Sequence, residues 1–333
     1  MSMTGKELAR ILGISETAVS MALNNKPGVS TQTRNKVKAA AEKYGMDLSK
    51  FAALPTLNSI YLVYYRRHGA VLVDSTFFSE LTEGVERACA SAGYRIYTVN
   101  VHEQEDLRRQ IDEISFKDAV GIILLGTEMR DDDFNVLAFS RVPIILLDNH
   151  FISSKVDSVR INNVDGAFLA TNYLINKRKT QPGYLHSSFY IHNFSERHEG
   201  YEKALRYNGM SPTQSVVHKL TPSIEGAYNE MREYLEKKGA LADCYFADND
   251  LIAIGVLRAL REAGYSVPKD VAVIGFDDIT MCNYTDPPLT TVHVPKQYMG
   301  YMAVERLLST LGKKDFYPVD ISISAHLVVR KSV

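Results

Sequence analysis

The sequence predicts an α/β protein with an N-terminal helix-turn-helix head of three helices and a two-lobed body of parallel sheets flanked by helices. Three observations support this prediction. The 333 residues exceed the usual size of a single domain. Residues 1–57 show helical periodicity and no strand pattern. Beyond them, short β-branched runs alternate with helical segments.

The first predicted helix lies in "TGKELARILG". Thr4 is an expected N-cap, and Glu7 three residues later completes a capping-box pattern. Leu8, Ile11 and Leu12 fall on one helical face, and the glycine that follows them is a natural stop.

Two further helices complete the head. Ser15 is positioned to cap "ETAVSMALNN", in which Val19 and Leu23 share the buried face. After the loop "KPGVS", Ser30 caps a third helix that ends at Gly45. Two short helices joined by a glycine turn, followed by a third, form the helix-turn-helix arrangement. A generic three-helix bundle is the alternative.

Charge and composition indicate the partners of the chain. Residues 1–57 contain eight Lys and Arg against four acidic residues, although the whole chain has a net charge of −1. A basic head on a mildly acidic body suggests that only the head binds a polyanion, and chance fluctuation is the alternative. Cys89, Cys244 and Cys282 lack metal-ligand spacing, and no signal pattern or run of ~18 apolar residues occurs. We therefore expect a cytoplasmic protein with buried thiols, no metal and no membrane contact.

The body contains near-continuously apolar strand patterns such as "SIYLVYY", "AVGIILLG", "VPIILLD" and "DVAVIGFDD". Their alternation with helical segments predicts parallel sheets covered on both faces, in two α/β units with a cleft between them. Ligands of such sheets bind beyond the carboxyl ends of the strands. Polar residues that follow strand patterns are therefore candidates: Arg66, Arg67, His68, Asn163, Asp165, Asn193, Arg197, Asn249, Asp250, Asp277 and Asp278.

These polar side chains suit a neutral polyhydroxylated ligand, because carboxylates and amides bind vicinal hydroxyls. Helix capping is an equal alternative for Asp250 and Asp278. Arg66 or Arg67 could instead meet an anionic group of an extended ligand.

An enzyme would need a reactive centre. The sequence contains no G-x-S-x-G, P-loop or G-x-G-x-x-G motif, and His192 and His198 are spaced unlike a metalloprotease pair. The adjacent Asp277 and Asp278 point to opposite sides of a strand end, which disfavours an acid–base pair. We expect no enzyme activity and no cofactor.

The segment "ELARILGISETAVSMALNNKPGVSTQTRNKVKAAAEKYGM" resembles the DNA-binding head of the lactose/galactose-repressor family of bacterial transcription factors. The shared features are the A-x-x-x-G-I-S turn, T-x-V-S, L-N and V-S-x-x-T-R-x-x-V. The resemblance implies base-edge contacts and backbone contacts from the head. The expected base-edge residues are Glu16, Thr17 and Met21, and the expected backbone contacts are Ser15, Ser20, Asn24 and Arg34.

The chain departs from the family pattern in two regions, the second helix of the head and the hinge. Many relatives carry Arg where this chain has Met21, which can make only apolar contact, for example with a thymine methyl. In the hinge "GMDLSKFAALP", Leu48 replaces the usual proline and Pro55 falls on the usual leucine. Leu54, one residue early, is then the candidate wedge for the minor groove.

The body also resembles this family, and through it the periplasmic sugar-binding proteins, in "RHEGYEKAL", "ADNDLIAIGVLRALREAGYSVPKDVAVIGFDD" and "DPPLTTVHVPKQYMGYMAVERLL". The implied effector contacts are Asp165, Asn193, Arg197, Asn249, Phe276 and Asp277, with Phe77 and Phe78 near the cleft. Because the chain has no Trp, ring stacking would fall to Phe77, Phe194, Phe246 or Phe276.

The expected domains are a head at 1–46, a hinge at 47–57, an N-terminal lobe at 58–161 and 292–320, and a C-terminal lobe at 162–289 and 321–333. The resemblance implies a cytoplasmic repressor of carbohydrate-utilisation genes. A homodimer would bind a near-palindromic double-stranded operator, and a sugar or sugar derivative in the interlobe cleft would change its DNA affinity.

The end of the chain bears on the oligomeric state. The chain ends in "HLVVRKSV" without an apolar heptad tail, so we expect a dimer and not a tail-assembled tetramer. Induction and corepression are both compatible with the sequence. The alternative function is that of a cytoplasmic sugar-binding or sugar-processing protein without operator binding.

Overall fold

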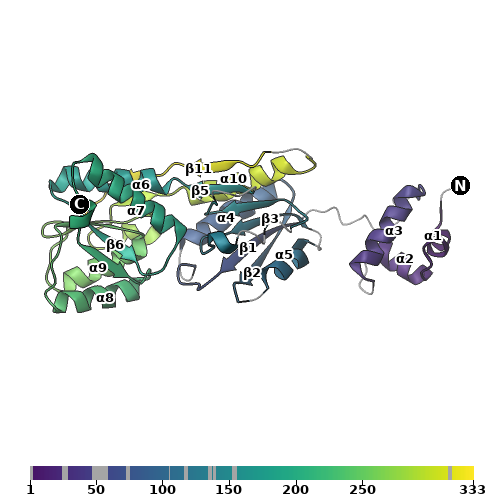
Figure 1. Cartoon of the computed structure of the whole chain (residues 1–333), viewed down its shortest axis with the longest axis horizontal. Coiled ribbons are helices and arrows are strands. Elements are labelled where there is room, and N and C mark those ends of the chain that lie inside the picture. The colour runs from purple at the N-terminus through teal and green to yellow at the C-terminus, as the bar shows by residue number, and fades with distance from the viewer. Residues whose placement is uncertain are drawn as a thin grey trace.

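A computed structural model shows a three-helix head and two α/β lobes (Figure 1). The structure describes residues 3–24, 29–46, 59–72, 76–104, 106–115, 119–133, 137, 140–151, 156–313 and 317–333. The expected hinge, including Leu48, Leu54 and Pro55, lies outside the described residues.

The head consists of α1 (Gly5–Leu12), α2 (Glu16–Leu23) and α3 (Thr31–Lys43). The predicted caps are confirmed. The Thr4 amide donates to Glu7 Oε2 at 2.8 Å and the capping box closes in both directions. Ser15 Oγ accepts from the Ala18 amide at 3.1 Å, and Ser30 caps α3 in the same way. Local sequence therefore fixes where each helix of the head begins.

The core of the head contains Leu8, Ala9, Val19 and Leu23, all buried. The prediction for Ile11 is wrong, because 48% of this residue is exposed. Ala9 completes the buried stripe of α1 with Leu8, which turns Ile11 toward solvent.

The first lobe contains a six-stranded parallel sheet in the order β11-β5-β4-β3-β1-β2. Its strands are β1 (Ser59–Arg66), β2 (Arg95–His102), β3 (Ala119–Leu125), β4 (Ile144–Leu147), β5 (Asp157–Ile161) and β11 (Asp320–Ile323). On one face, Ile60 and Leu62 belong to a core with α4 (Thr76–Ser91) and α10 (Lys296–Thr310). On the other, Tyr61 and Val63 belong to a core with α5 (Leu107–Ser115). The predicted parallel sheet covered on both faces is confirmed.

The second lobe contains a four-stranded parallel sheet in the order β7-β6-β8-β9. Its strands are β6 (Gly183–Ser187), β7 (Val217–Leu220), β8 (Cys244–Ala247) and β9 (Ala272–Ile274). The helices are α6 (Asn163–Arg178), α7 (His192–Tyr207), α8 (Ile224–Glu236) and α9 (Asp250–Glu262), with 3₁₀ turns η3 (Pro212–Gln214) and η4 (Thr280–Asn283). A small antiparallel pair, β10 (Thr291–His293) with β12 (His326–Val328), was not expected from the sequence.

Three segments connect the lobes: one between β5 and α6, one between β10 and α10, and one after β11 (Figure 1). Because β11 pairs with β5 through Ile323, the boundary expected at residue 320 falls inside this strand. Asp157, only 2% exposed, accepts from Arg306 of α10 at 2.8 Å and from the Val319 amide at 2.7 Å. This carboxylate therefore links α10 and the segment before β11 to the β5 strand of the first lobe.

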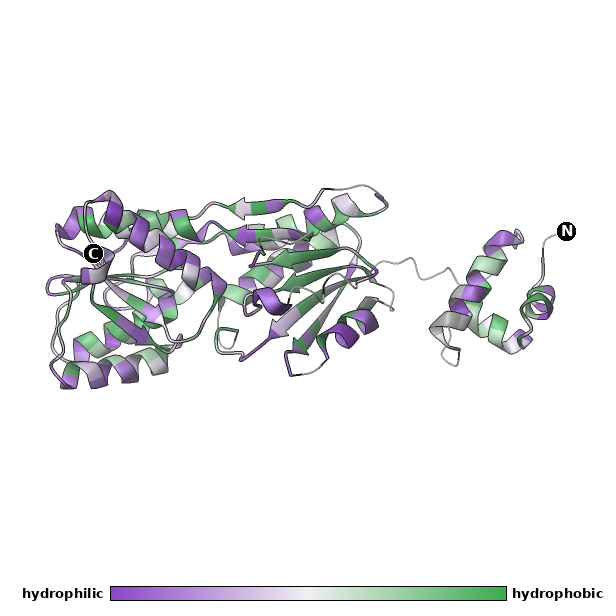
Figure 2. Cartoon of the chain, viewed as in Figure 1, coloured by the Kyte–Doolittle hydropathy of each residue, from purple (hydrophilic) through white to green (hydrophobic). Residues whose placement is uncertain are grey.

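Helices α6 and α7 pack closely against each other. A Cβ at Gly200 of α7 would lie 2.2 Å from the Val164 carbonyl oxygen of α6, so only glycine fits there. Hydrophobic residues concentrate on the strands, and the helices alternate between hydrophobic and hydrophilic positions (Figure 2).

The three cysteines are free and buried, as expected. Among the described helices, none combines the length and apolar character that crossing a membrane requires.

Candidate functional site

A pocket lies where the two lobes face each other. The first lobe contributes Val71, Phe77, Phe78, Thr127 and Asp148, and the second contributes Ile191, Asn193, Phe194, Arg197, Asn249, Leu251 and Asp277. Six of the eight expected effector contacts therefore lie together: Phe77, Phe78, Asn193, Arg197, Asn249 and Asp277.

Arg197 of α7 is the central cation of the pocket. It is 2% exposed, and its Nη2 lies 3.0 Å from Asp277 Oδ1. Its Nε donates to Asn163 Oδ1 at 2.9 Å and its Nη1 to the Asp248 carbonyl oxygen at 2.5 Å. The guanidinium also lies 3.8 Å from the centroid of the Phe276 ring. These contacts hold the guanidinium in one orientation.

Asp148 is a pocket residue that sequence reasoning missed. Its Oδ2 accepts from Thr127 Oγ1 at 2.6 Å, and its Oδ1 accepts from Asn193 Nδ2 at 3.0 Å. The second bond joins the lobes. A signal was present in the sequence, because Asp148 directly follows the strand pattern "VPIILL" in the way other candidates follow theirs.

Burial governs the charges of the pocket. Desolvation raises the pKa of Asp148 to about 7, and the nearby Asp277 adds to this, against the opposing effects of Thr127 and Arg197. Desolvation likewise raises the pKa of Asp277, and Arg197 opposes it. The ion pair with Arg197 favours a charged Asp277 in the pocket.

Asn249 lines the pocket and also caps α9, because its Oδ1 accepts from the Ile252 amide at 2.9 Å. The predicted cap at Asp250 is therefore wrong by one residue. Asp250 is buried and accepts from Thr291 Oγ1 at 2.5 Å and from the Ile279 amide at 2.9 Å. It fixes the loop after β9, which carries Asp277.

The predicted cap at Asp278 is also wrong, because Ile279 precedes the 3₁₀ turn η4. The carboxylate of Asp278 lies 2.8 Å from His293 Nδ1 and 2.7 Å from Arg330 Nη2. These two contacts hold the pKa of Asp278 below its ordinary value even though burial opposes them.

Two expected effector contacts do not line the pocket. Asp165 lies in the first turn of α6, where its side chain is 61% exposed and pairs with Lys203 at 3.4 Å. Its carboxylate also accepts from Asn162 Nδ2 at 2.9 Å, at the exposed start of the helix. Phe276 is fully buried beneath Arg197 and supports the guanidinium.

The remaining sequence candidates lie elsewhere. Phe194 lines the pocket, whereas Phe246 is buried in an aromatic cluster with its ring centroid 5.7 Å from that of Tyr184. Neither Arg66 nor Arg67 lines the pocket. Arg67 pairs with Glu103 and, at 2.6 Å, with Asp133. An anionic effector would therefore not meet these arginines in the pocket.

In the head, α2 exposes one face and buries the other. Ser15, Glu16, Thr17 and Ser20 are exposed, and Met21 is half-buried. Asn24 follows the helix, and its Nδ2 donates to the Ser20 carbonyl oxygen at 2.9 Å. Arg34 lies half-buried in the first turn of α3. The expected DNA contacts that the structure describes thus lie at or beside an accessible helix face suited to a major groove.

Two buried carboxyls, Asp148 in the pocket and Asp250 behind it, predict a pH dependence of stability. Burial raises the pKa of both Asp148 and Asp250 to about 7, so the folded state binds protons that the unfolded chain releases above about pH 4. This stabilising contribution is complete below about pH 4 and is lost as pH rises through about 7. In urea titrations, Asp148→Asn should therefore gain stability relative to the unsubstituted chain as pH rises from about 5 to about 8. A difference that stays constant over this range contradicts the prediction.

Comparisons with known proteins agree with this arrangement. Residues 4–46 match the family "Bacterial regulatory proteins, lacI family", and residues 171–333 match the "Periplasmic binding protein-like domain". The ribose operon repressor of Escherichia coli (strain K12) is 30% identical over 335 residues, which cover 99% of each chain.

Solved structures agree in fold over most or all of the chain. The transcriptional regulator CelR in its cellobiose complex has a TM-score of 0.74 and 26% identity, covering 99% of this chain and 100% of that one. A LacI family transcriptional regulator from Enterococcus faecium with bound ribose has a TM-score of 0.71 and 25% identity, covering 82% of this chain and 98% of that one. The chain belongs to the LacI family, whose members are DNA-binding transcriptional regulators with an effector-binding domain and not enzymes.

Proposed function

We propose that this regulator is a cytoplasmic homodimeric repressor of carbohydrate-utilisation genes, and that a sugar in the interlobe pocket changes its affinity for a near-palindromic operator. The observation that carries the proposal is the group of polar side chains in the pocket: Asp148, Asn193, Arg197, Asn249 and Asp277. Similarity to the ribose operon repressor and to regulators solved with cellobiose and ribose supports a sugar as effector.

The charge of the pocket favours a neutral ligand. Two carboxyls, Asp148 and Asp277, face one guanidinium, and Arg197 already pairs with Asp277. Among the described residues that line the pocket, Arg197 is the one cation, so an added anionic group would meet these carboxyls without an unpaired cation to offset them. Sugar hydroxyls can instead donate to the carboxylates and accept from the guanidinium. Phe77 and Phe78 offer an apolar wall for the carbon face of a ring.

Lobe closure is the proposed route from the pocket to DNA. Because the pocket draws residues from both lobes, an effector that contacts both favours the closed arrangement. Closure would shift the paired first lobes of the dimer and so change the spacing of the two heads. An effector acts only through its different affinities for the two states, which leaves induction and corepression equally open.

In the head, we assign base-edge contacts to Glu16, Thr17 and Met21 on the exposed face of α2. Ser15, Ser20, Asn24 and Arg34 would position the DNA backbone. Leu54 stays the predicted wedge for the minor groove.

Selection of binding sites from a randomised duplex pool tests operator recognition. We expect the full-length protein to enrich a near-palindromic sequence whose affinity falls steeply as salt rises, because phosphate contacts release counterions. Random duplex serves as the control. If no sequence is preferred over it at any salt concentration, operator recognition as proposed here is wrong.

A thermal-shift screen against sugars, sugar phosphates and nucleosides identifies the effector. A ligand at a hundred times its Kd should stabilise the protein by about 2.7 kcal/mol by mass action. Arg197→Ala should abolish this shift and the effector response while operator binding persists. Asp165→Asn is the control, because Asp165 lies outside the pocket and should leave the shift unchanged. An undiminished response in Arg197→Ala removes this residue from the site.

Met21→Arg tests the base contact of α2. Met21 can make only apolar contact, so the selected operator should favour a thymine methyl at the matching position. Arg can donate two hydrogen bonds to guanine, and the variant should move the preference toward guanine there by about 1–3 kcal/mol. Identical selected sequences would show that Met21 does not reach the bases.

A further inference from the structure

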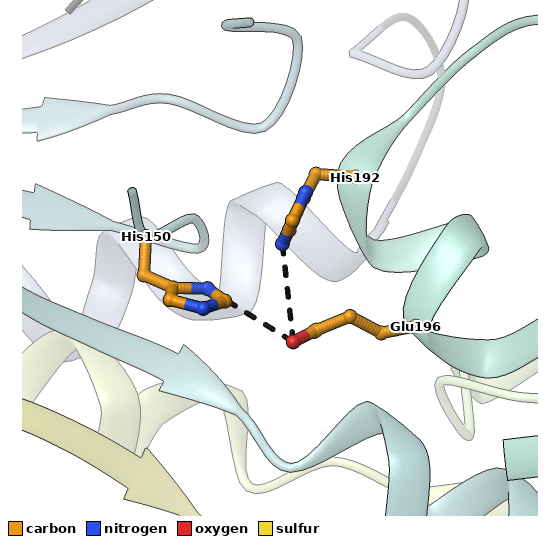
Figure 3. Close-up of side chains that lie close together, drawn as sticks. All are labelled: His150, His192 and Glu196. Atoms are coloured by element: carbon orange, nitrogen blue, oxygen red, sulfur yellow. Dashed lines mark ion pairs between the residues drawn. The ribbon is translucent and has the colours of Figure 1, made fainter. Parts of the chain in front are cut away.

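A cluster of two imidazoles and one carboxylate lies beside the pocket without being part of it (Figure 3). His150 follows β4 in the first lobe, whereas His192 begins α7 and Glu196 lies one turn later in that helix. His150 Nδ1 and His192 Nε2 each lie 3.9 Å from Glu196 Oε1. The side chains point toward a common centre (Figure 3).

His150 Nδ1 and His192 Nε2 are both buried and have no hydrogen-bond partner among the residues that the structure describes. A buried polar atom without a partner is costly, and native proteins leave few of them. A neutral imidazole carries a lone pair on one ring nitrogen, and in this form histidine binds metal ions. Two imidazole nitrogens and a carboxylate that face one point are the kind of ligand set that binds a metal ion.

The helix positions two of these donors. His192 and Glu196 are four residues apart, so they lie on the same face of α7. Asn193 and Arg197, each one residue further along, point into the pocket instead. One turn of α7 thus presents one pair of side chains to the pocket and the other pair to His150.

The surrounding charges leave room for a cation. Arg160 Nη1 donates to Glu196 Oε1 at 3.0 Å, and its Nε donates to Asp320 at 2.9 Å. Arg160 thus lies between two carboxylates, so these three side chains together carry a net charge of −1. Asn163 Nδ2 donates to Glu196 Oε2 at 2.8 Å, which orients the carboxylate as supporting residues orient metal ligands.

We propose that His150, His192 and Glu196 bind a divalent transition-metal ion, with Zn²⁺ the best fit and water as its fourth ligand. The three donor atoms lie within 4.8 Å of one another. An ion among them would come within about half an ångström of the ~2.1 Å that Zn²⁺ adopts with nitrogen and oxygen donors. Two His and one Glu form a donor set that zinc uses with one open position.

Such an ion would join the segment after β4 to the start of α7. Asp148 and Asn193, which hydrogen-bond across the lobes at 3.0 Å, each lie within two residues of a proposed ligand. The ion would therefore hold together the same two segments that the effector contacts. This goes beyond the proposed function, and the metal can be tested without an effector.

Calorimetric titration of the full-length, tag-free protein with ZnCl₂ tests the site. We expect one ion per chain, and at least a tenfold loss of affinity in His192→Gln and in His150→Gln. His198→Gln is the matched control. His198 shares α7 and pairs with Glu202 four residues later at the same 3.9 Å, but belongs to no metal-sized cluster in the described part of the chain. Equal losses in all three variants, or no heat above that of buffer, would overturn the proposal.

Two measurements on the unsubstituted protein test the site even if the variants fail to fold. In NMR spectra of the side chains, Zn²⁺ should shift the signals of two of the nine histidines, His150 and His192. Co²⁺ in place of Zn²⁺ should give the intense visible absorption of a tetrahedral site. Shifts spread over many histidines, or a weak octahedral Co²⁺ spectrum, would show an adventitious ion only and refute the site.

Discussion

The buried guanidinium of Arg197 is the constraint on which the pocket depends. A charge at this depth is tolerated only when its donors are paired, and the protein pairs them with three different elements. Asn163 comes from α6, the Asp248 carbonyl from the end of β8, and Asp277 from the loop after β9. The requirement to satisfy one side chain therefore fixes how α7 lies against the sheet of the second lobe.

Asn163 extends this constraint beyond the pocket. Its oxygen accepts from Arg197, and its nitrogen donates to Asn193 Oδ1 at 3.1 Å and to Glu196 at 2.8 Å. The pocket and the His150 cluster thus share one amide, and a change of orientation at Asn163 would reach both. Asn163 is fully buried, so this coupling is protected from solvent.

The sequence predicted best those features that depend on residues close together along the chain. The caps at Thr4, Ser15 and Ser30 and the parallel sheets follow from local hydrogen bonds and from runs of apolar residues. The predictions were wrong for residues whose position depends on contacts with segments far away along the chain. Asp165 pairs with Lys203 of α7 at the surface, while Asp148 enters the pocket only because Thr127 and Asn193 come to it from remote parts of the chain.

The close contact at Gly200 has a mechanical consequence. With no side chain between them, α6 and α7 cannot slide past each other without a clash at the Val164 carbonyl, so they move as one rigid lever. The start of α6 directly follows β5, at the first of the three connections between the lobes. A displacement of α7 would therefore be carried by α6 to the connection that follows β5.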